Sequence, residues 1–516
     1  MNSSLHPATN GEQPFPSRDR QGAVFVLRTI SLTVLLAATS FAATNGDIRL
    51  VEAVKNRDTT QIASLLAQKA NPNTPEPDGT TALHWAVRAD NASLVDRLLR
   101  AGANPQTANR YGVTPLYLAC LNGNAQTIDR LLKAGAQVNT PSSEGETPLM
   151  TVARAGNIEA AKVLLAHGAD VYARETWHRQ TALMYAAGES HPEMMRLLIA
   201  HGALVNDQDG VQKWERQTTS EPREKWLPTG ALTPLLFAAR QGCVECAQVL
   251  VEHGAELNAT DRDGITPMIS AIINGHYDVA AFLVEHGANP NLADKTGRTA
   301  LYAAVDFHTM PQDNRPSPKD IDNKVSSFEL IQLLIAKGAN VNAQLKTQQP
   351  YRAKLDRGDD TMLTTGTTPM LRAAKAADIP VVKLLLEKGA DPKLVTRNGV
   401  NPLMAAAGVG SREEDNTGRK KTEPETIETI KLLLAAGVDI NAVDSRGQSA
   451  LHGAAFWGKD EVVAFLARSG AKLDLKDKKG FTPLDSALGV AGGVGFDQAS
   501  STPRPSTVEL LKKLAN

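Results

Sequence analysis

Two cysteines three positions apart, Cys243 and Cys246, come closest in this sequence to a reactive centre. A Cys-x-x-Cys pair at the start of a helix can exchange thiol for disulfide, because the helix N-terminus favours a thiolate. Cys246, however, falls on an apolar-periodic position, which indicates a buried side chain. The third cysteine, Cys120, leaves too few to staple a long chain, so no disulfide framework is implied. A structural role is the preferred interpretation, and redox activity is the alternative.

Four histidines form a second pattern that could do chemistry, since each precedes a Gly-Ala pair: His167, His201, His253 and His286. Helices of neighbouring units lie about 8–10 Å apart. Two ligands of one zinc ion, each about 2 Å from it, must lie within about 4 Å of each other. The spacing therefore argues against a metal site, and we expect each ring to serve the C-terminus of its own helix.

Signatures of an enzyme are missing from the sequence. It contains neither a Gly-x-Ser-x-Gly elbow nor a His-Glu-x-x-His motif, and the glycine-rich stretch 489–495 lacks the Lys-Ser/Thr of a phosphate loop. The 55 basic and 56 acidic residues nearly cancel, so no overall field favours nucleic acid. We therefore expect no catalytic residue, no cofactor, no metal and no nucleic-acid partner.

The elements behind these residues follow from an internal repeat. The phrase that begins Thr81-Ala82-Leu83-His84 returns at Thr114 and Thr147, each time after 33 residues. Repetition of this kind is the sequence signature of stacked units. Longer gaps equal the same period plus insertions. Further copies begin at Thr181, Thr233, Thr266, Thr299, Thr368, Asn401, Ser449 and Thr482.

Each unit carries the signals of two helices. The Thr, Ser or Asn that opens the phrase can cap a helix, and the Pro that often follows suits its first turn. A second apolar-periodic segment, such as residues 93–100, closes with Gly-Ala, where glycine such as Gly102 can adopt the left-handed conformation. One helix pair cannot bury its apolar face alone, so neighbours must stack into a continuous superhelix.

These phrases closely resemble the ankyrin repeat over residues 48–516, and their wording is similar to exported bacterial ankyrin proteins. The resemblance implies an all-α repeat solenoid, an ankyrin superhelix of about eleven helix-turn-helix repeats that binds proteins. Residues 43–516 would form one monomeric domain with an N-terminal capping unit at 43–73. The repeats are expected to begin near residues 79, 112, 145, 179, 231, 264, 297, 366, 399, 447 and 480.

The first 42 residues differ in composition and are interpreted as a signal peptide. A polar segment with Arg18, Arg20 and Arg28 precedes an apolar run at 29–43. This run of about 15 residues is shorter than the roughly 20 that a membrane-spanning helix needs. Cleavage after Ala42 would send the chain to the periplasm or outside the cell, with no stable transmembrane span. An uncleaved anchor, or a start codon further downstream, stays open.

Five insertions interrupt the period: residues 207–230, 306–326, 343–366, 408–424 and 489–502. Their plain interpretation is surface loops, because added loop length costs little free energy. The first and third fall in turns between repeats, where they could extend a binding edge. Trp214 and Trp226, both in the first insertion, are the reason for considering that role.

Several side chains are candidates for contact with a partner. Phe456 and Trp457 hold positions that face the concave groove in ankyrin repeats, although both rings could instead pack on the neighbouring repeat. Trp177 and Tyr111 lie in turns that usually project outward, and Arg110 and His178 are weaker companions. Exposed aromatic residues at such places are typical of binding hot spots.

The leading hypothesis is an exported scaffold that captures a protein along its concave face. An alternative is an accessory to a redox or hydrolytic envelope enzyme, with a small site near Asp207, Trp214 and Cys243. A structural or carbohydrate-binding role is a third possibility that the aromatic residues in the turns permit.

Overall fold

Helices and turns make up almost all of the structure. The computed structural model describes residues 47–211, 230–309, 322–347, 363–411, 421–490 and 502–516. Within these ranges the only β pairing is an isolated antiparallel bridge between Ala293 and Thr299. The prediction of an all-α repeat solenoid is thus confirmed. The predicted signal peptide at 1–42, together with Trp214 and Trp226, lies outside the described residues.

The helices come in pairs, after a capping pair formed by α2 (Arg49–Lys55) and α3 (Thr59–Ala67). The first helices of the repeats are α4 (Ala82–Arg88), α6 (Pro115–Asn122), α8 (Pro148–Arg154), α10 (Ala182–Gly188), α12 (Pro234–Gln241), α14 (Pro267–Ile273), α16 (Ala300–Thr309), α18 (Pro369–Lys375), α20 (Pro402–Ala407), α22 (Ala450–Phe456) and α24 (Pro483–Ala487). The second helices are α5 (Ala92–Arg100), α7 (Ala125–Lys133), α9 (Ile158–Ala166), α11 (Pro192–Ala200), α13 (Val244–Glu252), α15 (Tyr277–Glu285), α17 (Ser327–Ala336), α19 (Ile379–Glu387), α21 (Glu423–Ala435), α23 (Asp460–Arg468) and α25 (Pro505–Ala515).

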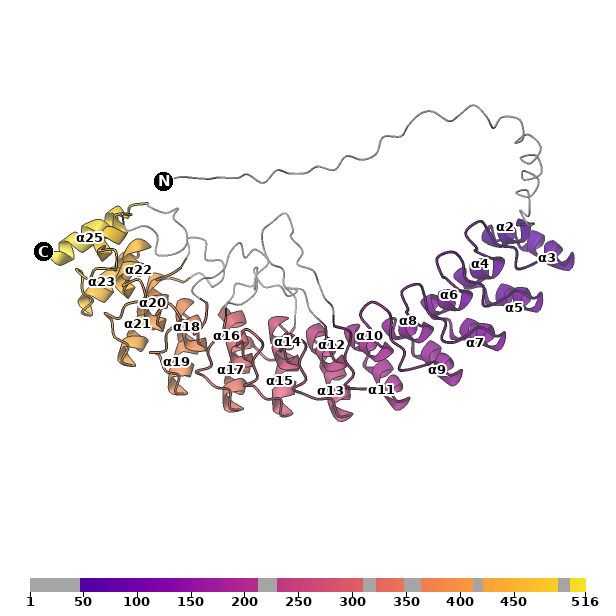
Figure 1. Ribbon diagram of the computed structural model, residues 1–516, viewed down its shortest axis with the longest axis horizontal. Helices are drawn as coiled ribbons and strands as arrows, with labels where there is room; N and C mark the ends of the chain where they lie inside the picture. Colours follow the sequence, from indigo (N-terminus) through magenta and orange to yellow (C-terminus); the bar gives the residue numbers. More distant parts are fainter. Residues whose placement is uncertain (1–46, 212–229, 310–321, 348–362, 412–420, 491–501) are drawn as a thin grey trace, which may run out of the picture.

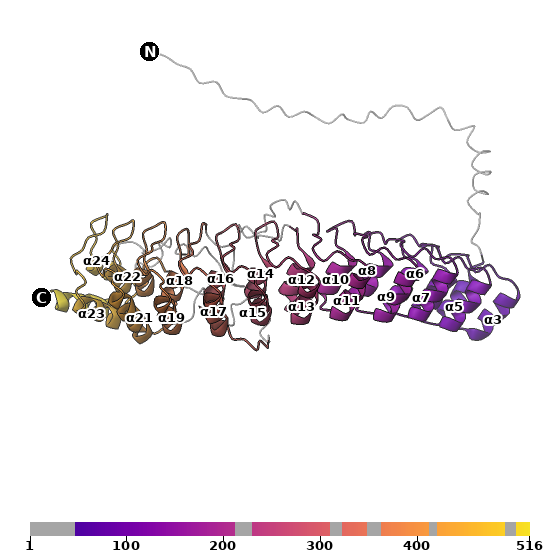
Figure 2. The same ribbon diagram turned by 90° about the horizontal axis from the view of Figure 1, so that it is seen from below.

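The stacked pairs bend into an arc. The first helices line its inner, concave side and the second helices its outer side (Figure 1). Each helix contacts its own partner, every first helix contacts those of the neighbouring repeats, and most second helices do the same, so one apolar core runs along the solenoid. The turns that join one repeat to the next, which we call fingers, project to one side of the helices (Figure 2).

Helix ends form where the sequence predicts them. The Thr114 hydroxyl accepts the N–H of Tyr117 at 3.1 Å, and other first helices repeat this cap. Gly102, after α5, takes a φ of 88°, which is the left-handed closure. In the capping pair Lys69 holds the corresponding place with a φ of 61°. A residue with a Cβ is strained in that conformation. Such a departure from the repeat pattern is typical of a terminal capping unit.

The fingers are shaped by a polar side chain five residues before the cap. The Asp261 carboxylate accepts the N–H groups of Asp263 and Ile265, each at 2.8 Å. Neighbouring fingers are tied together by backbone bonds such as that from the Arg110 N–H to the Asp78 carbonyl, at 2.8 Å. The same arrangement places two finger N–H groups on one side chain at Asn109, Asp294, Asp444 and Asp477.

Two expected insertion boundaries are wrong. The insertion expected from residue 306 begins later, because α16 continues through Asp306 to Thr309. Asp306 is buried and accepts a 2.5 Å bond from Arg372, so this acidic residue belongs to the core of the repeat rather than to a loop. The insertion expected to end at residue 424 ends earlier, since Thr422 already caps α21 in a capping box with Glu425.

Candidate binding site on the inner face

Aromatic rings with stacked cations mark the inner face of the first repeats. Four residues after the capping residue, α4 carries Trp85 and α10 carries Tyr185. The guanidinium of Arg88 lies 5.4 Å from the centroid of the Trp85 ring. That of Arg154, from α8, lies 4.5 Å from the Tyr185 ring. Rings presented in this way attract cations through their negative faces.

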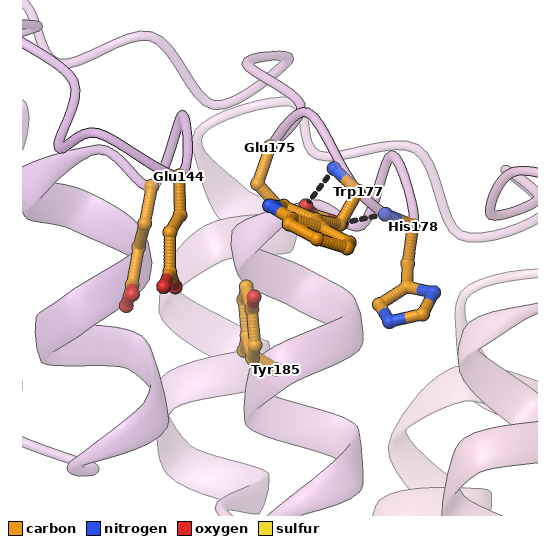
Figure 3. Close-up of a pocket in the computed structure, with 6 residues that line it drawn as sticks. Glu144, Glu175, Trp177, His178 and Tyr185 are labelled. Carbon is orange, nitrogen blue, oxygen red and sulfur yellow. Dashed lines mark hydrogen bonds between the residues drawn. The ribbon is translucent and has the colours of Figure 1, made fainter. Parts of the chain in front are cut away.

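The concave side also contains a pocket of about 250 Å³ between two fingers and α10 (Figure 3). The finger between α7 and α8 contributes Glu144 and Glu146, and α10 contributes Tyr185. The finger between α9 and α10 contributes Glu175, Trp177 and His178. The Glu144 carbonyl accepts bonds from the N–H and hydroxyl of Thr176, at 3.2 and 2.6 Å. These bonds hold the two walls of the pocket in register.

Glu175 builds the finger that presents Trp177. Its buried carboxylate accepts the N–H groups of Trp177, His178 and Gln180 at 2.5, 2.7 and 2.9 Å. Three such bonds close a tight turn around the carboxylate and hold its negative charge beside the pocket. The Trp177 ring lies at the tip of this turn and is 71% exposed. The expectation that Trp177 projects outward is confirmed.

Opposite charges meet on the other wall of the pocket. Arg154 forms an ion pair of 2.8 Å with the buried carboxylate of Glu146 while its guanidinium lies over Tyr185. Although burial acts to lower it, Glu146 and Tyr185 raise the pKa of Arg154, which stays charged. Burial raises the pKa of the Tyr185 phenol, so the ring stays neutral. Together, Glu144, Glu146 and Glu175 give the lining of the pocket three carboxylates, beside the one guanidinium of Arg154.

Tyr111 projects from the finger between α5 and α6 and is 56% exposed. Arg110, its neighbour, donates a hydrogen bond to the Tyr111 hydroxyl, and its guanidinium lies 4.8 Å from the centroid of the ring. The outward position predicted for Tyr111 is therefore confirmed, and Arg110 braces this ring. Two fingers separated by the Glu144 finger thus both end in an exposed aromatic side chain.

The groove-facing position predicted for Phe456 is wrong. Phe456 is only 7% exposed and packs in a small cluster with Leu363 and Val409, which lie near the ends of two insertions. Trp457 is half-buried, meets Phe456 edge-on at 5.1 Å, and donates its Nε1–H to the carbonyl of Gly408 at 2.9 Å. The insertion ends cover this part of the inner face, so the alternative that the rings pack internally holds for Phe456.

The candidate redox pair is a disulfide in the structure. Cys243 and Cys246 are bonded to each other at the start of α13. The Cys246 side chain is fully buried, as its apolar position predicted, and Cys243 caps the helix by accepting the Cys246 N–H at 3.1 Å. Asp207, from the same alternative hypothesis, instead pairs with Arg174 in the neighbouring finger.

Three of the four histidines that precede Gly-Ala pairs bond to the ends of their own helices, as predicted. His201, His253 and His286 bond through Nδ1 to carbonyls of their own helices, at 2.9, 2.7 and 2.7 Å. His167 differs, since its Nε2 lies 3.1 Å from the Asp129 carboxylate. Among the described residues no group of three or more His, Cys, Asp or Glu side chains could hold a metal ion.

Sequence reasoning missed most of the pocket: Glu144, Glu146, Glu175, Tyr185 and Arg154. A signal was present, because an aromatic residue recurs four positions after the capping residue and an arginine seven positions after it. The aromatic position is filled by Trp85, Tyr185 and Phe237, and the arginine position by Arg88, Arg154 and Arg240. What joins them to the finger carboxylates is the stacking of adjacent repeats.

Comparison with known proteins settles the family. The model of the family described as "Ankyrin repeats (3 copies)" matches residues 50–142, 136–209, 235–312, 321–414 and 423–491. The chain is an ankyrin-repeat protein. Ankyrin repeats are in general modules of protein–protein interaction.

This ankyrin-repeat protein is similar to segments of two much larger proteins. It is 32% identical to neurogenic locus notch homolog protein 1 of Xenopus tropicalis over 139 residues, which are 23% of this chain and 6% of that protein. It is 30% identical to human neurogenic locus notch homolog protein 2 over 182 residues, 32% of this chain and 7% of that protein. The chain therefore spans less than a tenth of these relatives.

A solved structure, the human ASB11 ankyrin repeat domain, matches 50% of the ankyrin-repeat protein and 98% of its own chain, with 24% identity and a TM-score of 0.38. The predicted similarity to exported bacterial ankyrin proteins stays a prediction. Among the described residues no helix combines the length and apolarity that a membrane crossing requires.

Proposed function

We propose that this ankyrin-repeat protein is an exported, non-catalytic scaffold that binds a protein partner with the fingers and inner face of its N-terminal repeats. The observation that carries the proposal is the exposure of Trp177 and Tyr111 on fingers that flank the Glu144 finger. Exposed aromatic side chains beside a concave pocket are typical centres of protein interfaces.

The site of action is proposed to be the periplasm or the cell exterior. Support comes from the basic segment and short apolar run within the first 43 residues. The Cys243–Cys246 disulfide agrees with this location, because disulfides persist in oxidising compartments. The balance of basic and acidic residues supports a protein rather than a nucleic-acid partner.

The test is capture of a partner from the envelope and secreted fractions of the source organism. The bait is the full chain, compared with a Tyr111→Ala, Trp177→Ala double variant. We expect a specific protein that binds the wild type and binds the double variant about 30-fold or more weakly, as loss of a hot spot requires. The purified pair would be measured by calorimetry.

A matched control separates binding from folding. Tyr172 is as exposed as Tyr111 but lies beside Gly202, at the end of the outer helix α11. The Tyr172→Ala variant should keep full affinity, and all three proteins should melt at nearly the same temperature. The proposed surface would be contradicted if the Tyr172 variant lost as much affinity as the double variant. It would also be contradicted if the partner bound the wild type and both variants equally well.

One observation favours a second candidate, an accessory role in thiol chemistry. Cys243 is only partly buried and begins a helix, where a thiolate is favoured. Its partner Cys246 is fully buried, which suits a structural bond better. If the pair exchanges disulfides, the full chain should catalyse reduction of a model protein disulfide by dithiothreitol, and Cys243→Ser should abolish that activity. No rate above the uncatalysed reaction would exclude this role.

A further inference from the structure

We propose that the pocket between the Glu144 and Trp177 fingers receives an arginine side chain of the partner. The inference rests on the proposed function and names the chemistry that this surface recognises. The pocket has aromatic side chains at Trp177 and Tyr185 and carboxylates at Glu144, Glu146 and Glu175. A planar guanidinium suits both features, because it stacks on aromatic faces and donates bonds to carboxylates in the same plane.

The arrangement of side chains fits an occupant between the walls. Figure 3 shows the Trp177 ring above Tyr185, with the Glu144 carboxylate to one side and Glu175 behind the tryptophan. Trp177 is largely exposed and Tyr185 half-buried, so one wall of the pocket faces solvent and the other belongs to the helix layer. His178 lies at the far side of Trp177 from Glu144 (Figure 3).

An independent observation shows that this wall already holds a guanidinium. Arg154 lies 4.5 Å from the centroid of the Tyr185 ring and 2.8 Å from the Glu146 carboxylate, so two residues that line the pocket bind a cation of the chain itself. An aromatic ring and a glutamate from a finger are the two partners. The remaining carboxylates that line the pocket are Glu144, from the same finger as Glu146, and Glu175, from the Trp177 finger.

The same arrangement occurs at the N-terminal end of the solenoid. Lys55 lies 4.8 Å from the Trp85 ring and 2.9 Å from the Glu76 carboxylate, which also accepts the Trp85 Nε1–H at 2.6 Å. Lys55 and Arg154 each end the inner helix that precedes the aromatic residue. The chain thus twice places a cation between an inner-helix ring and a finger glutamate, and the pocket offers further carboxylates beside such a pair.

Charge balance points in the same direction. The three lining carboxylates exceed the guanidinium of Arg154 by two negative charges. A cation that enters reduces this excess, whereas an anion would increase it. Coulomb attraction near a protein surface falls with added salt. Binding of the arginine should therefore weaken as the sodium chloride concentration rises.

The experiment uses the full chain labelled with 5-fluorotryptophan and observed by ¹⁹F NMR. The five tryptophans give distinct resonances, and a Trp177→Phe variant identifies that of Trp177. The probe is the peptide acetyl-Gly-Gly-Arg-Gly-Gly-amide. Its control replaces arginine with citrulline, which has the same shape without the charge. We expect the arginine peptide to shift the Trp177 signal in a saturable manner and the citrulline peptide to leave it unchanged.

Substitutions in the pocket complete the test. Glu144 is exposed, and its hydrogen bonds to Thr176 are made by its backbone carbonyl, so Glu144→Gln removes a charge and leaves the fold intact. We expect it to weaken the arginine peptide about two- to fivefold, as an exposed ion pair would. The matched control is Glu159→Gln on the outer helix α9, where the glutamate pairs with Lys162 and should not matter.

The outcomes separate the two proposals. Equal shifts with arginine and citrulline, or equal affinity in the Glu144 and Glu159 variants, would overturn the arginine site. If a captured partner depends on Trp177 while the arginine peptide leaves Trp177 unmoved, the scaffold proposal stands and this one fails. If the arginine peptide binds as expected but no partner protein is captured, the pocket stands and the scaffold proposal fails.

Discussion

The inner faces of the two ends of the solenoid use the same helix positions in opposite ways. From α4 to α12, which we call the open region, the residue seven positions after the cap is an exposed arginine in three helices: Arg88, Arg154 and Arg240. From α16 to α22, the covered region, the same position holds Asp306, Lys375 and Phe456, all buried. Four positions after the cap, half-buried Tyr185 in the open region corresponds to fully buried Arg372 in the covered region.

The cause lies in residues near the ends of the insertions. Leu363 and Val409 pack against Phe456, and the Lys421 ammonium donates to the carbonyls of Lys375 and Ala406, each at 2.8 Å. These segments bury the covered region, so it has little inner surface left for a partner. The open region keeps its three arginines exposed and the rings of Trp85 and Tyr185 half-buried. We therefore expect the insertions to limit binding to the open region of an otherwise uniform superhelix, and changes in the two regions should have different consequences.

The largest effect should come from the buried ion pair of the covered region. Asp306→Ala leaves the Arg372 guanidinium without its carboxylate in the core, which costs about 3–5 kcal/mol. Since each repeat contacts only its neighbours, the loss should concentrate in α16 and α18. Hydrogen exchange resolved by peptide would show faster exchange there, and urea unfolding would give the free energy.

Arg154→Met in the open region is the matched control for that ion pair. The Arg154 side chain is 45% exposed, so its pairing with Glu146 should contribute less than about 1 kcal/mol. A double variant with Asp306→Leu and Arg372→Met should recover most of the lost stability, because apolar side chains can replace a buried pair. Equal destabilisation by the Asp306 and Arg154 changes would refute the distinction between the regions.

Phe456→Ala should cost about 3 kcal/mol, because it removes a buried ring and leaves a cavity between α22 and the insertion ends. Affinity for the partner should not change, since the proposed binding surface lies in the open region. Trp177→Ala should do the reverse, with stability within about 0.5 kcal/mol of wild type and a large loss of affinity. A loss of affinity in a still-folded Phe456 variant would place the partner in the covered region.

The sequence predicted the helix pairs well because the signals are local. Thr114 caps the start of α6 and Gly102 follows the end of α5, and both signals act within a few residues. Residue types and their spacing are therefore enough to predict the helix boundaries. Phe456 was assigned to the groove because its place in the repeat is a groove position. Its burial depends on Leu363 and Val409, which arrive from two insertions whose paths no period describes.

The pocket escaped prediction for a related reason. Glu144 and Trp177 are 33 residues apart, in successive fingers. The sequence predicted Trp177 as an exposed ring, but no local signal connects it with Glu144. They share one cavity only because the Thr176 backbone bonds to the Glu144 carbonyl. Glu175 also departs from the finger pattern seen at Asp261, since its side chain accepts three finger N–H groups rather than two.

The pH dependence of stability should differ in sign between fingers. Burial raises the pKa of Asp261 to about 6, although the Ile265 N–H opposes this. The carboxyl stabilises the fold when protonated, below about pH 4, and this contribution is lost as the pH rises through 6. Relative to that of the Asp261→Asn variant, the free energy of unfolding of the wild type should fall by about 2 kcal/mol between pH 4 and 7. Urea unfolding of both proteins at these pH values measures it.

Asp78, in a finger of the open region, provides the opposite case. The Thr80 N–H lowers the pKa of this exposed carboxyl. Its contribution is therefore present above the unfolded pKa and lost as the pH falls through the lower folded value. Relative to that of the Asp78→Asn variant, the free energy of unfolding of the wild type should rise with pH, by less than it falls in the Asp261 comparison. A difference of the same sign for both variants would show that burial does not control the Asp261 carboxyl.

The smallest effect should come from a glycine that sets the distance between fingers of the open region. Gly145 has a φ of 82°, and a Cβ there would lie 2.8 Å from the Thr176 backbone nitrogen. Gly135 has a φ of 99° with nothing within 4 Å of such a Cβ. In both alanine variants the left-handed backbone should lower the free energy of unfolding by about 1 kcal/mol. Only Gly145→Ala must also push the Trp177 finger away from Glu144.

Gly145→Ala should therefore weaken the arginine peptide and the protein partner, whereas Gly135→Ala should leave both affinities unchanged at a similar melting temperature. The ¹⁹F signal of Trp177 should move in the unliganded Gly145 variant alone. If the two variants bind alike, the spacing of the fingers does not set the pocket, and the open region binds through its separate exposed rings rather than through the cavity between them.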